Sequence, residues 1–286
     1  MKRFLLILVL VCAAAAHAWG RAQNAAPQAP ANAAPAATPT IPVDQENARK
    51  AKALVDQAIQ ALGGQAYLTI RDRELTGRTF GFHHGQSTGN GIEFWSFSEF
   101  PDKERVELTK QRDIAELYVG NRGFEITYKG PKPIEPKDLD DYMRRRRFSL
   151  ERILRTWVPD PSVAMLYEGH ANAAQHPALR VTLINAKNEA VTIDFDVDTH
   201  LPVRKSFEWR DPVDRQKNLE EEIYDNYRLV QGVMTPYNVT GYFNGDMARA
   251  RYIFTAAYNS GLDQAMFDPN SGYDPIKQPG KQSKKR

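Results

Sequence analysis

Ser87 lies in the segment of this sequence that most resembles a catalytic nucleophile. Residues 85–89 read G-Q-S-T-G, which fits the G-x-S-x-G pattern, and Asp198 and His200 follow in the chain order of a hydrolase triad. A nucleophile elbow needs a strand before the serine and a helix after it, whereas the strand-like residues 92–100 follow here. We therefore expect a glycine-rich hairpin loop, with a serine hydrolase using Ser87 and His200 as an alternative.

Two groups of side chains are of the types that can bind metal ions. The scattered histidines show neither the helical H-E-x-x-H spacing nor a paired cysteine; they are His83, His84, His170, His176 and His200. Asp194, Asp196 and Asp198 resemble the start of a calcium loop, but the required glycine and the closing glutamate are missing. We expect neither a metal nor another cofactor, and we place the three aspartates on the solvated face of a strand.

Four consecutive arginines, Arg144, Arg145, Arg146 and Arg147, form the densest charge of the chain. Guanidinium groups suit a phosphate or the anionic head of an amphiphile. A solvated helix face is the simpler alternative. The sequence leaves both interpretations open.

Two amphipathic helices are predicted from apolar residues at helical spacing. The first begins at Asp44 and ends before Gly63-Gly64, which supplies a left-handed stop. The second follows Pro136 and carries the arginines. Its apolar stripe consists of Leu150, Ile153, Leu154 and Trp157, and Pro159 and Pro161 end it.

Elsewhere the apolar period is two, which is typical of half-buried strands. Short turns at 185–188, 198–200, Gly232 and 244–246 separate successive strands, which favours an antiparallel meander over alternating βαβ units. A meander of this length must curl. We predict a mostly β (α+β) fold, an open, unclosed antiparallel β-barrel covered by the two helices.

The termini define the expected domain organisation. Lys2 and Arg3, an apolar run and Ala16-His17-Ala18 are typical of a secretory signal, so we expect a signal peptide over 1–18, with 22 as the alternative end. An Ala/Pro-rich disordered linker over 19–43, a domain over 44–270 and a disordered basic tail over 271–286 follow. The apolar run is too short to span a membrane, so no stable span is expected after cleavage.

Composition narrows the classes of partner. The formal net charge is only +3 and no phosphate-binding or base-stacking motif is present, so no nucleic-acid partner is expected. The single cysteine, Cys12, lies inside the signal, which leaves a mature chain without disulfides. Cys12 follows a large residue rather than a small one, so lipidation is the less favoured alternative.

Several short segments resemble the outer-membrane lipoprotein-sorting (LolA-like) superfamily over about residues 44–269. They are A-L-G-G at 61–64, the D-T-H-L-P hairpin at 198–202, G-V-M-T-P at 232–236, Y-N-S-G-L-D at 258–263 and F-D-P at 267–269. The resemblance implies an unclosed β-barrel whose mouth helices cover, with an apolar cavity and no catalytic residue. It also implies that the chain carries or senses lipids or lipid-modified proteins in the periplasm.

From the residues and this resemblance we expect a periplasmic, non-enzymatic lipid- or lipoprotein-binding carrier. Its partners would be a lipid or lipid-modified protein, with transport components of the inner or outer membrane as further candidates. An envelope regulatory or assembly module acting through a protein partner is an alternative. The concave face is assigned to Phe124, Tyr128, Phe195, Phe207 and Trp209. The lid is assigned to Leu150, Ile153, Leu154 and Trp157, and an anionic head group to Arg144–Arg147.

Overall fold

The structure, a computed structural model, describes residues 43–275. The helical elements are α1 (Val43–Leu62), α2 (Gln65–Leu68), α3 (Pro136–Arg147), α4 (Leu150–Arg152), the π-type turn η1 (Ile153–Trp157) and the 3₁₀ turn η2 (Gln264–Phe267). The strands are β1 (Asp72–His83), β2 (Gln86–Ser87), β3 (Ile92–Glu99), β4 (Lys103–Leu108), β5 (Ile114–Val119), β6 (Arg122–Thr127), β7 (Gly130–Pro133), β8 (Ala164–Ala173), β9 (His176–Ile184), β10 (Ala190–Asp196), β11 (Pro202–Arg210), β12 (Lys217–Val230), β13 (Val233–Phe243) and β14 (Asp246–Tyr258).

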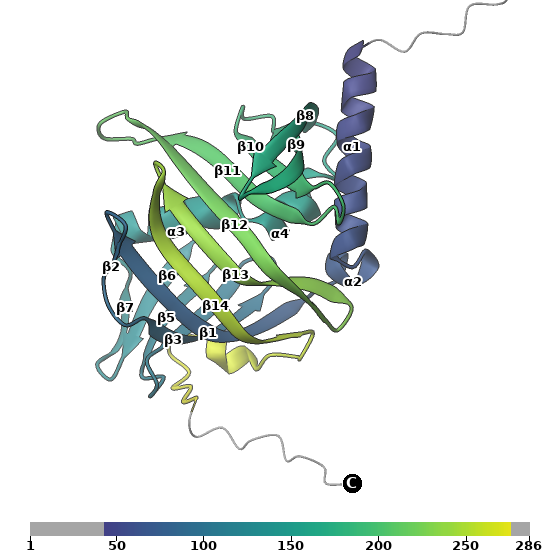
Figure 1. Cartoon of the computed structure of the whole chain (residues 1–286). Helices are drawn as coiled ribbons and strands as arrows, with labels where there is room; N and C mark the ends of the chain where they lie inside the picture. The colour runs from purple at the N-terminus through teal and green to yellow at the C-terminus, as the bar shows by residue number, and fades with distance from the viewer. Residues whose placement is uncertain (1–42, 276–286) are drawn as a thin grey trace, which may run out of the picture. The chain divides into compact units, whose positions relative to one another are not determined.

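All strands belong to one antiparallel, 14-stranded sheet in which neighbours along the chain mostly pair with each other. The order is β7-β6-β5-β4-β3-β1-β14-β13-β12-β11-β10-β9-β8, with β2 paired to β1 (Figure 1). The pairing of β1 with β14 joins the two halves of the meander. Because β7 and β8 do not pair with each other, the sheet is not closed, which confirms the predicted open barrel with helices.

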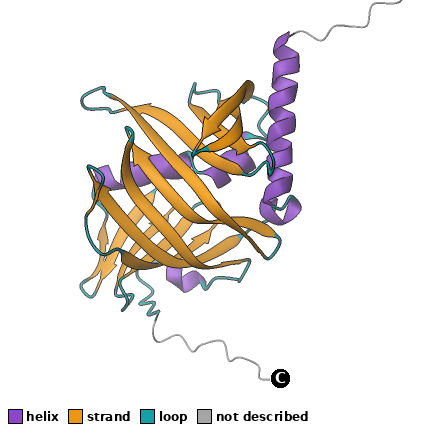
Figure 2. Cartoon of the chain, viewed as in Figure 1, coloured by secondary structure: helices purple, strands orange, loops and turns teal. Residues whose placement is uncertain are grey.

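The contacts of α3 show how strongly the sheet curves. The hydroxyl of Tyr142 donates to Glu104 on β4 over 2.8 Å, and Nε of Arg144 donates to Glu220 on β12 over 3.0 Å. Along the sheet these strands are five spacings apart, about 24 Å at the usual strand separation. Two residues of one helix turn reach both strands because the sheet curls around α3 (Figure 2).

Helix α1 confirms the first predicted helix. It ends where segments 61–64 and 232–236, both similar to the LolA-like superfamily, lie close together. Gly63 and Gly64 both have positive φ values, 127° and 56°, which favour glycine. A Cβ on Gly63 would lie 2.2 Å from the carbonyl oxygen of Gly232, in the β12–β13 turn. Gly63 therefore allows the end of α1 to approach this turn closely.

The second predicted helix is divided into three parts. Helix α3 ends at Arg147, and Ser149 caps α4 by accepting a hydrogen bond from the amide of Arg152 over 3.3 Å. The π-type turn η1 follows and ends at Trp157, before Pro159 and Pro161 as the sequence predicts. Between the two helices, the ring of Phe148 stacks on Phe207 of β11, with 4.2 Å between the ring centroids.

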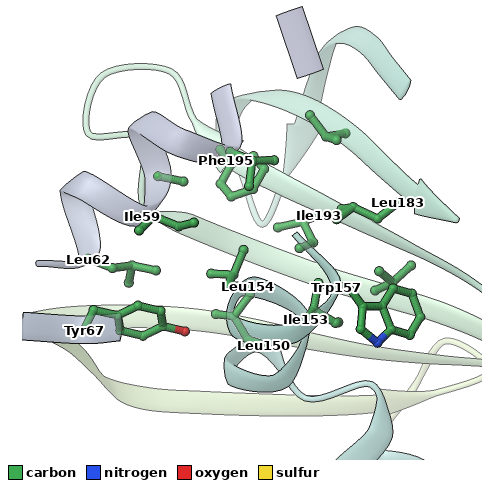
Figure 3. Close-up of a cluster of buried hydrophobic side chains, with 14 of the residues drawn as sticks. Ile59, Leu62, Tyr67, Leu150, Ile153, Leu154, Trp157, Leu183, Ile193 and Phe195 are labelled. Carbon is green, nitrogen blue, oxygen red and sulfur yellow. The ribbon is translucent and has the colours of Figure 1, made fainter. Parts of the chain in front are cut away.

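The main core lies between α1, the α4–η1 segment and strands β9 to β11. Figure 3 shows Ile59 and Leu62 of α1 near Leu154, and Trp157 near Leu183. Phe195, Ile193 and Ile153 in this cluster have no exposed surface. The segment that contains Trp157 is thus part of the core and lies inside the curve of the sheet.

The C-terminal segment packs on the opposite, convex face. Met266 and Phe267 of η2 contact Leu117 of β5, and Tyr273 joins the same cluster. The guanidinium of Arg105, whose side chain is 3% exposed, stacks on the Tyr273 ring at 4.7 Å and pairs with Glu107 at 2.7 Å. Packed structure therefore continues beyond residue 270, where we expected the domain to end.

The predicted signal peptide over 1–18, nearly all of the linker over 19–43 and residues 276–286 of the basic tail lie outside the described residues. Among the helices of residues 43–275, none combines the length and the apolar character needed to cross a membrane.

Candidate functional site: a cavity between α3 and the curved sheet

A cavity of about 1570 Å³ lies inside the curve of the sheet, bounded by α1, α2 and the α3–η1 segment. Typical small-molecule pockets measure roughly 300–1,000 Å³, so this cavity has room for a long ligand. Residues from both halves of the meander line it, including Leu75 and Val106 from one half and Val239 and Ile253 from the other. The cavity therefore depends on the curl described above.

One part of the lining is apolar and lies beneath α1, α2 and α4–η1. It includes Ile59 and Leu62 of α1, Leu150 and Leu154 of the α4–η1 segment, and Val233 of β13. Contact of a hydrocarbon chain with such a surface removes apolar area from water, which is favourable in proportion to the area.

The other part of the lining carries charge, which the sequence analysis did not predict. On β12, Glu222 pairs with Lys205 of β11 at 2.7 Å and with Arg249 of β14 at 2.6 Å, and Tyr224 donates to it over 2.8 Å. Burial opposes ionisation of Glu222, but Lys205 and Arg249 outweigh it and hold its pKa well below the usual range. Glu222 is therefore a fixed anion between two cations.

Across the cavity, Glu104 of β4 accepts hydrogen bonds from Tyr142 over 2.8 Å and from Ser96 over 3.1 Å. The rings of Tyr142 and Tyr118 stack with centroids 3.4 Å apart, and the Tyr118 hydroxyl donates to Glu116 over 3.0 Å. Burial, followed by the nearby carboxylates, raises the pKa of both tyrosines far above the ordinary value, so both remain protonated donors.

A buried ion pair ties the sheet to α4. Arg73 of β1 binds Glu151 through its Nη1 atom; burial opposes ionisation of Glu151, but Arg73 lowers the pKa of this carboxyl overall. Nearby, the Tyr67 hydroxyl of α2 borders the cavity and is buried without a hydrogen-bond partner among residues 43–275. Burial raises its pKa, so this hydroxyl stays neutral.

The aromatic residues expected on the concave face do not line this cavity. Phe195, Phe207 and Trp209 do face inward, but the core, Phe148 and Arg144 cover them. Phe124 pairs with Leu117 and packs with it on the convex face. Tyr128 lies in the turn after β6 and is 90% exposed. These two assignments are corrected because β6 turns its aromatic residues away from the cavity and places Tyr128 beyond the end of the strand.

The four residues expected to form a lid are all buried, and they divide between two roles. Leu150 and Leu154, one helical turn apart, border the cavity. Ile153 and Trp157 point into the core toward β9 and β10 (Figure 3). Movement of this segment as a lid stays a prediction.

The four consecutive arginines have different surroundings. Arg144 lies over Trp209, 3.5 Å from the ring centroid, and Arg147 pairs with Glu189 at 2.6 Å. Arg146 donates to the backbone carbonyls of Asp102 and Gly120 over 3.2 and 2.8 Å. Arg145 and Arg146 border the cavity. The expectation of one four-arginine site is corrected, because successive helix residues point in different directions.

The structure does not bring the hydrolase candidates together. Ser87 is exposed in the predicted hairpin, and its Oγ donates to the carbonyl of Gly89 over 2.7 Å. His200 lies in the β10–β11 turn, and β14, β13 and β12 separate β11 from β1. An activated serine needs its base within hydrogen-bond reach, and no hydrogen bond joins these two side chains among residues 43–275.

The aspartate series also differs from its expected place. Asp194 is buried on β10 between Arg180 and Arg204, at 2.6 and 2.7 Å, instead of lying on a solvated face. Asp196 accepts backbone hydrogen bonds from the turn that follows it. Within the described part of the chain, no group of three or more His, Cys, Asp or Glu side chains is arranged to hold a metal ion.

Sequence reasoning missed the arginines of β14. Arg249 and Arg251 alternate with Ala250 and Tyr252 along the strand. In the structure Arg249 and Arg251 line the cavity, whereas Tyr252 is 46% exposed on the other face. The alternation of charged and uncharged residues could have indicated that the arginines share one face of the strand. A period of two does not say which face is inward.

No protein-family model and no curated protein sequence matches the chain. Solved structures are similar to it. A DUF1329 family protein from Desulfovibrio piger has a TM-score of 0.52 at 13% identity, covering 76% of this chain and 97% of that chain. A putative outer membrane lipoprotein-sorting protein domain from Vibrio parahaemolyticus has a TM-score of 0.51 at 13% identity, covering 78% and 98%. A LolA superfamily protein from Nitrosomonas europaea has a TM-score of 0.47 at 11% identity, covering 76% and 97%.

The first two similarities extend over nearly the whole of each solved chain, at an identity that shows fold alone. They agree with the open, helix-covered antiparallel sheet described above. The chain therefore shares the fold of these two proteins.

Proposed function

We propose that this protein is a periplasmic, non-enzymatic lipid- or lipoprotein-binding carrier that holds acyl chains in the cavity between α3 and the sheet, acting in outer-membrane lipoprotein sorting. The observation that carries the proposal is the cavity of about 1570 Å³ that the fold leaves inside its curve. The similarity to a putative lipoprotein-sorting domain supports the assignment to sorting.

The chemistry of the lining supports an acyl ligand. The surface beneath α1, α2 and α4–η1 is formed by aliphatic side chains. Burying an acyl chain is worth about 0.8 kcal/mol per CH₂ group, so a twelve-carbon chain can offset the cost of association without any covalent step.

Thermal unfolding of the protein without its expected signal, with and without dodecanoate below its micellar concentration, tests the proposal. A ligand at about 100 times its Kd stabilises the folded state by about 2.7 kcal/mol, which raises Tm by roughly 5–11 °C for a domain of this size. Mass spectrometry of the purified protein should in addition detect a copurified acyl compound. An unchanged Tm with every acyl ligand tried would contradict the proposal.

A cavity-filling variant locates the binding. Val239→Trp places an indole in the cavity lining of β13, and we expect it to reduce dodecanoate binding by at least about tenfold. Val213→Trp makes the same change in a loop where the side chain is 90% exposed, and it should bind as the unmodified protein does. Equal binding by all three proteins would place the acyl site elsewhere.

A further inference from the structure

Three arginines that border the cavity form no side-chain hydrogen bond and no ion pair within residues 43–275: Arg145 of α3, Arg152 of α4 and Arg251 of β14. Of these, Arg145 and Arg251 lie near Arg249. Burial lowers the pKa of both guanidinium groups, and Arg249 adds repulsion to each. Both groups nevertheless remain cations, because an arginine keeps its proton at any physiological pH.

The carboxylates near these two arginines are bound by other groups. Around Arg145, the acids are Glu220 and Asp141, and Arg144 binds both, at 3.0 and 2.7 Å. Around Arg251, the acids are Glu104 and Glu222. Tyr142 and Ser96 bind the first of these, and Lys205, Arg249 and Tyr224 bind the second.

Arg251 also lies beside an apolar group, since its guanidinium is 5.3 Å from the centroid of the Phe94 ring. An aromatic face offsets part of the desolvation of a cation but accepts none of its N–H hydrogen bonds in the plane of the guanidinium. A buried cation without a counter-charge is costly, so this wall of the cavity favours an incoming anion.

We propose that Arg145 and Arg251 form a binding site for the anionic head, a carboxylate or a phosphate, of a single-chain amphiphile whose tail occupies the apolar part of the cavity. The inference rests on the proposed function for the tail and adds the class of head group. Guanidinium groups bind both oxyanions through paired N–H donors. The charge of the ligand then lies between α3 and β14.

The test compares ligands that share a tail and differ in head charge. Isothermal titration calorimetry with dodecyl phosphate, dodecanoate and neutral 1-dodecanol gives the three affinities. We expect both anions to bind at least about tenfold more tightly than the alcohol, the lower end of what charged hydrogen bonds contribute. If the two anions bind unequally, the tighter one shows whether the site prefers a phosphate or a carboxylate head.

Variants assign the preference to the two residues. Arg145→Gln/Arg251→Gln should reduce the anion preference to less than about threefold and leave 1-dodecanol binding unchanged, and its Tm should be equal or higher because two unpaired cations are removed. Arg145→Lys/Arg251→Lys should retain part of the preference. Arg228→Gln, which removes an exposed cation of β12, is the control and should retain all of it.

Equal affinity for the anions and the alcohol in the unmodified protein would overturn the head-group site while leaving the acyl carrier intact. Absence of binding by all three ligands would overturn both. A preference that survives Arg145→Gln/Arg251→Gln would also overturn the assignment to these residues.

Discussion

At the scale of single residues, some charged side chains at the cavity form ion pairs, whereas Arg145 and Arg251 have no ion-pair partner among the described residues. Lys205 of β11 is 2% exposed, and Glu222 of the cavity wall neutralises it at 2.7 Å. A buried pair of this kind contributes little net stability, but the loss of one partner is costly. Glu222 therefore supports the wall on which Arg249 and Arg251 lie.

Glu222→Gln should destabilise the protein by about 3–5 kcal/mol, because it leaves Lys205 buried without a counter-charge. Lys205→Met/Glu222→Gln should recover part of that loss, since the buried cation is gone. Urea unfolding measures both. Glu208→Gln removes an exposed partner of Lys217 and should change the free energy of unfolding by no more than about 1 kcal/mol. A similar small effect for Glu222→Gln would show that the pair is solvated.

The free energy of unfolding should fall as the pH drops below about 4.5, the ordinary pKa of a glutamate. The folded state holds the pKa of Glu222 and Glu151 below that value, so the unfolded state binds protons first. The stabilisation from these two carboxylates is present above their pKa in the unfolded state. It is lost as the pH falls toward their lower pKa in the folded state. Urea unfolding at several pH values between 6 and 3.5 measures the fall. It should be smaller in Glu222→Gln and unchanged in Glu208→Gln, and a flat profile would contradict the assignment.

At the scale of elements, helix ends and strand partners decide where the cavity opens. The end of α1 is fixed by its approach to the β12–β13 turn, where Gly63 and Gly232 meet. Two segments that suggested the LolA-like resemblance, 61–64 and 232–236, are therefore neighbours in space. A third, 258–263, is bound to β1, because the carboxylate of Asp72 accepts hydrogen bonds from the amides of Ser260 and Gly261 over 2.7 and 3.2 Å.

Gly63→Ala should destabilise the protein by about 1–3 kcal/mol. The new Cβ would lie 2.2 Å from the Gly232 carbonyl oxygen, at a φ of 127° that alanine rarely adopts, so α1 or the turn must shift. Thermal unfolding measures the loss. Gly89→Ala is the control, because its Cβ would meet nothing within 4 Å, and it should be nearly neutral. Equal effects of the two substitutions would show that the close approach has no energetic consequence.

At the scale of the whole described domain, an unclosed sheet must protect its edges. Edge strand β7 carries Pro131 and Pro133, and the amide of Ile134 donates back to Gly123 over 3.0 Å. Because amide directions alternate along a strand, the two prolines remove the donors that would point outward from the edge. The convex face is protected differently, since the segment that contains η2 and Tyr273 covers part of it.

Truncation after Gly261 should destabilise the protein by more than about 3 kcal/mol, because it removes Met266 and Phe267 and exposes Leu117. It also uncovers Arg105, which donates to the carbonyl of Met266 over 3.2 Å. Truncation after Pro275 is the matched control. It removes only residues 276–286, which lie outside the described structure, and should leave Tm within about 1 °C. Equal stability of the two truncated proteins would contradict a structural role for the segment.

The sequence by itself determined the elements: α1 and its glycine stop, the prolines after Trp157, and the turns between strands. It also predicted the open, helix-covered antiparallel sheet, because local backbone preferences and apolar periods are properties of neighbouring residues. Only the tertiary structure decided which face of each strand is inward. Tyr252 turned outward and Arg251 inward, and Phe124 moved to the convex face, because a period of two is satisfied equally by both orientations. The charged wall of the cavity, with Arg145 from one element and Arg251 from another, arises only when the sheet curls around α3.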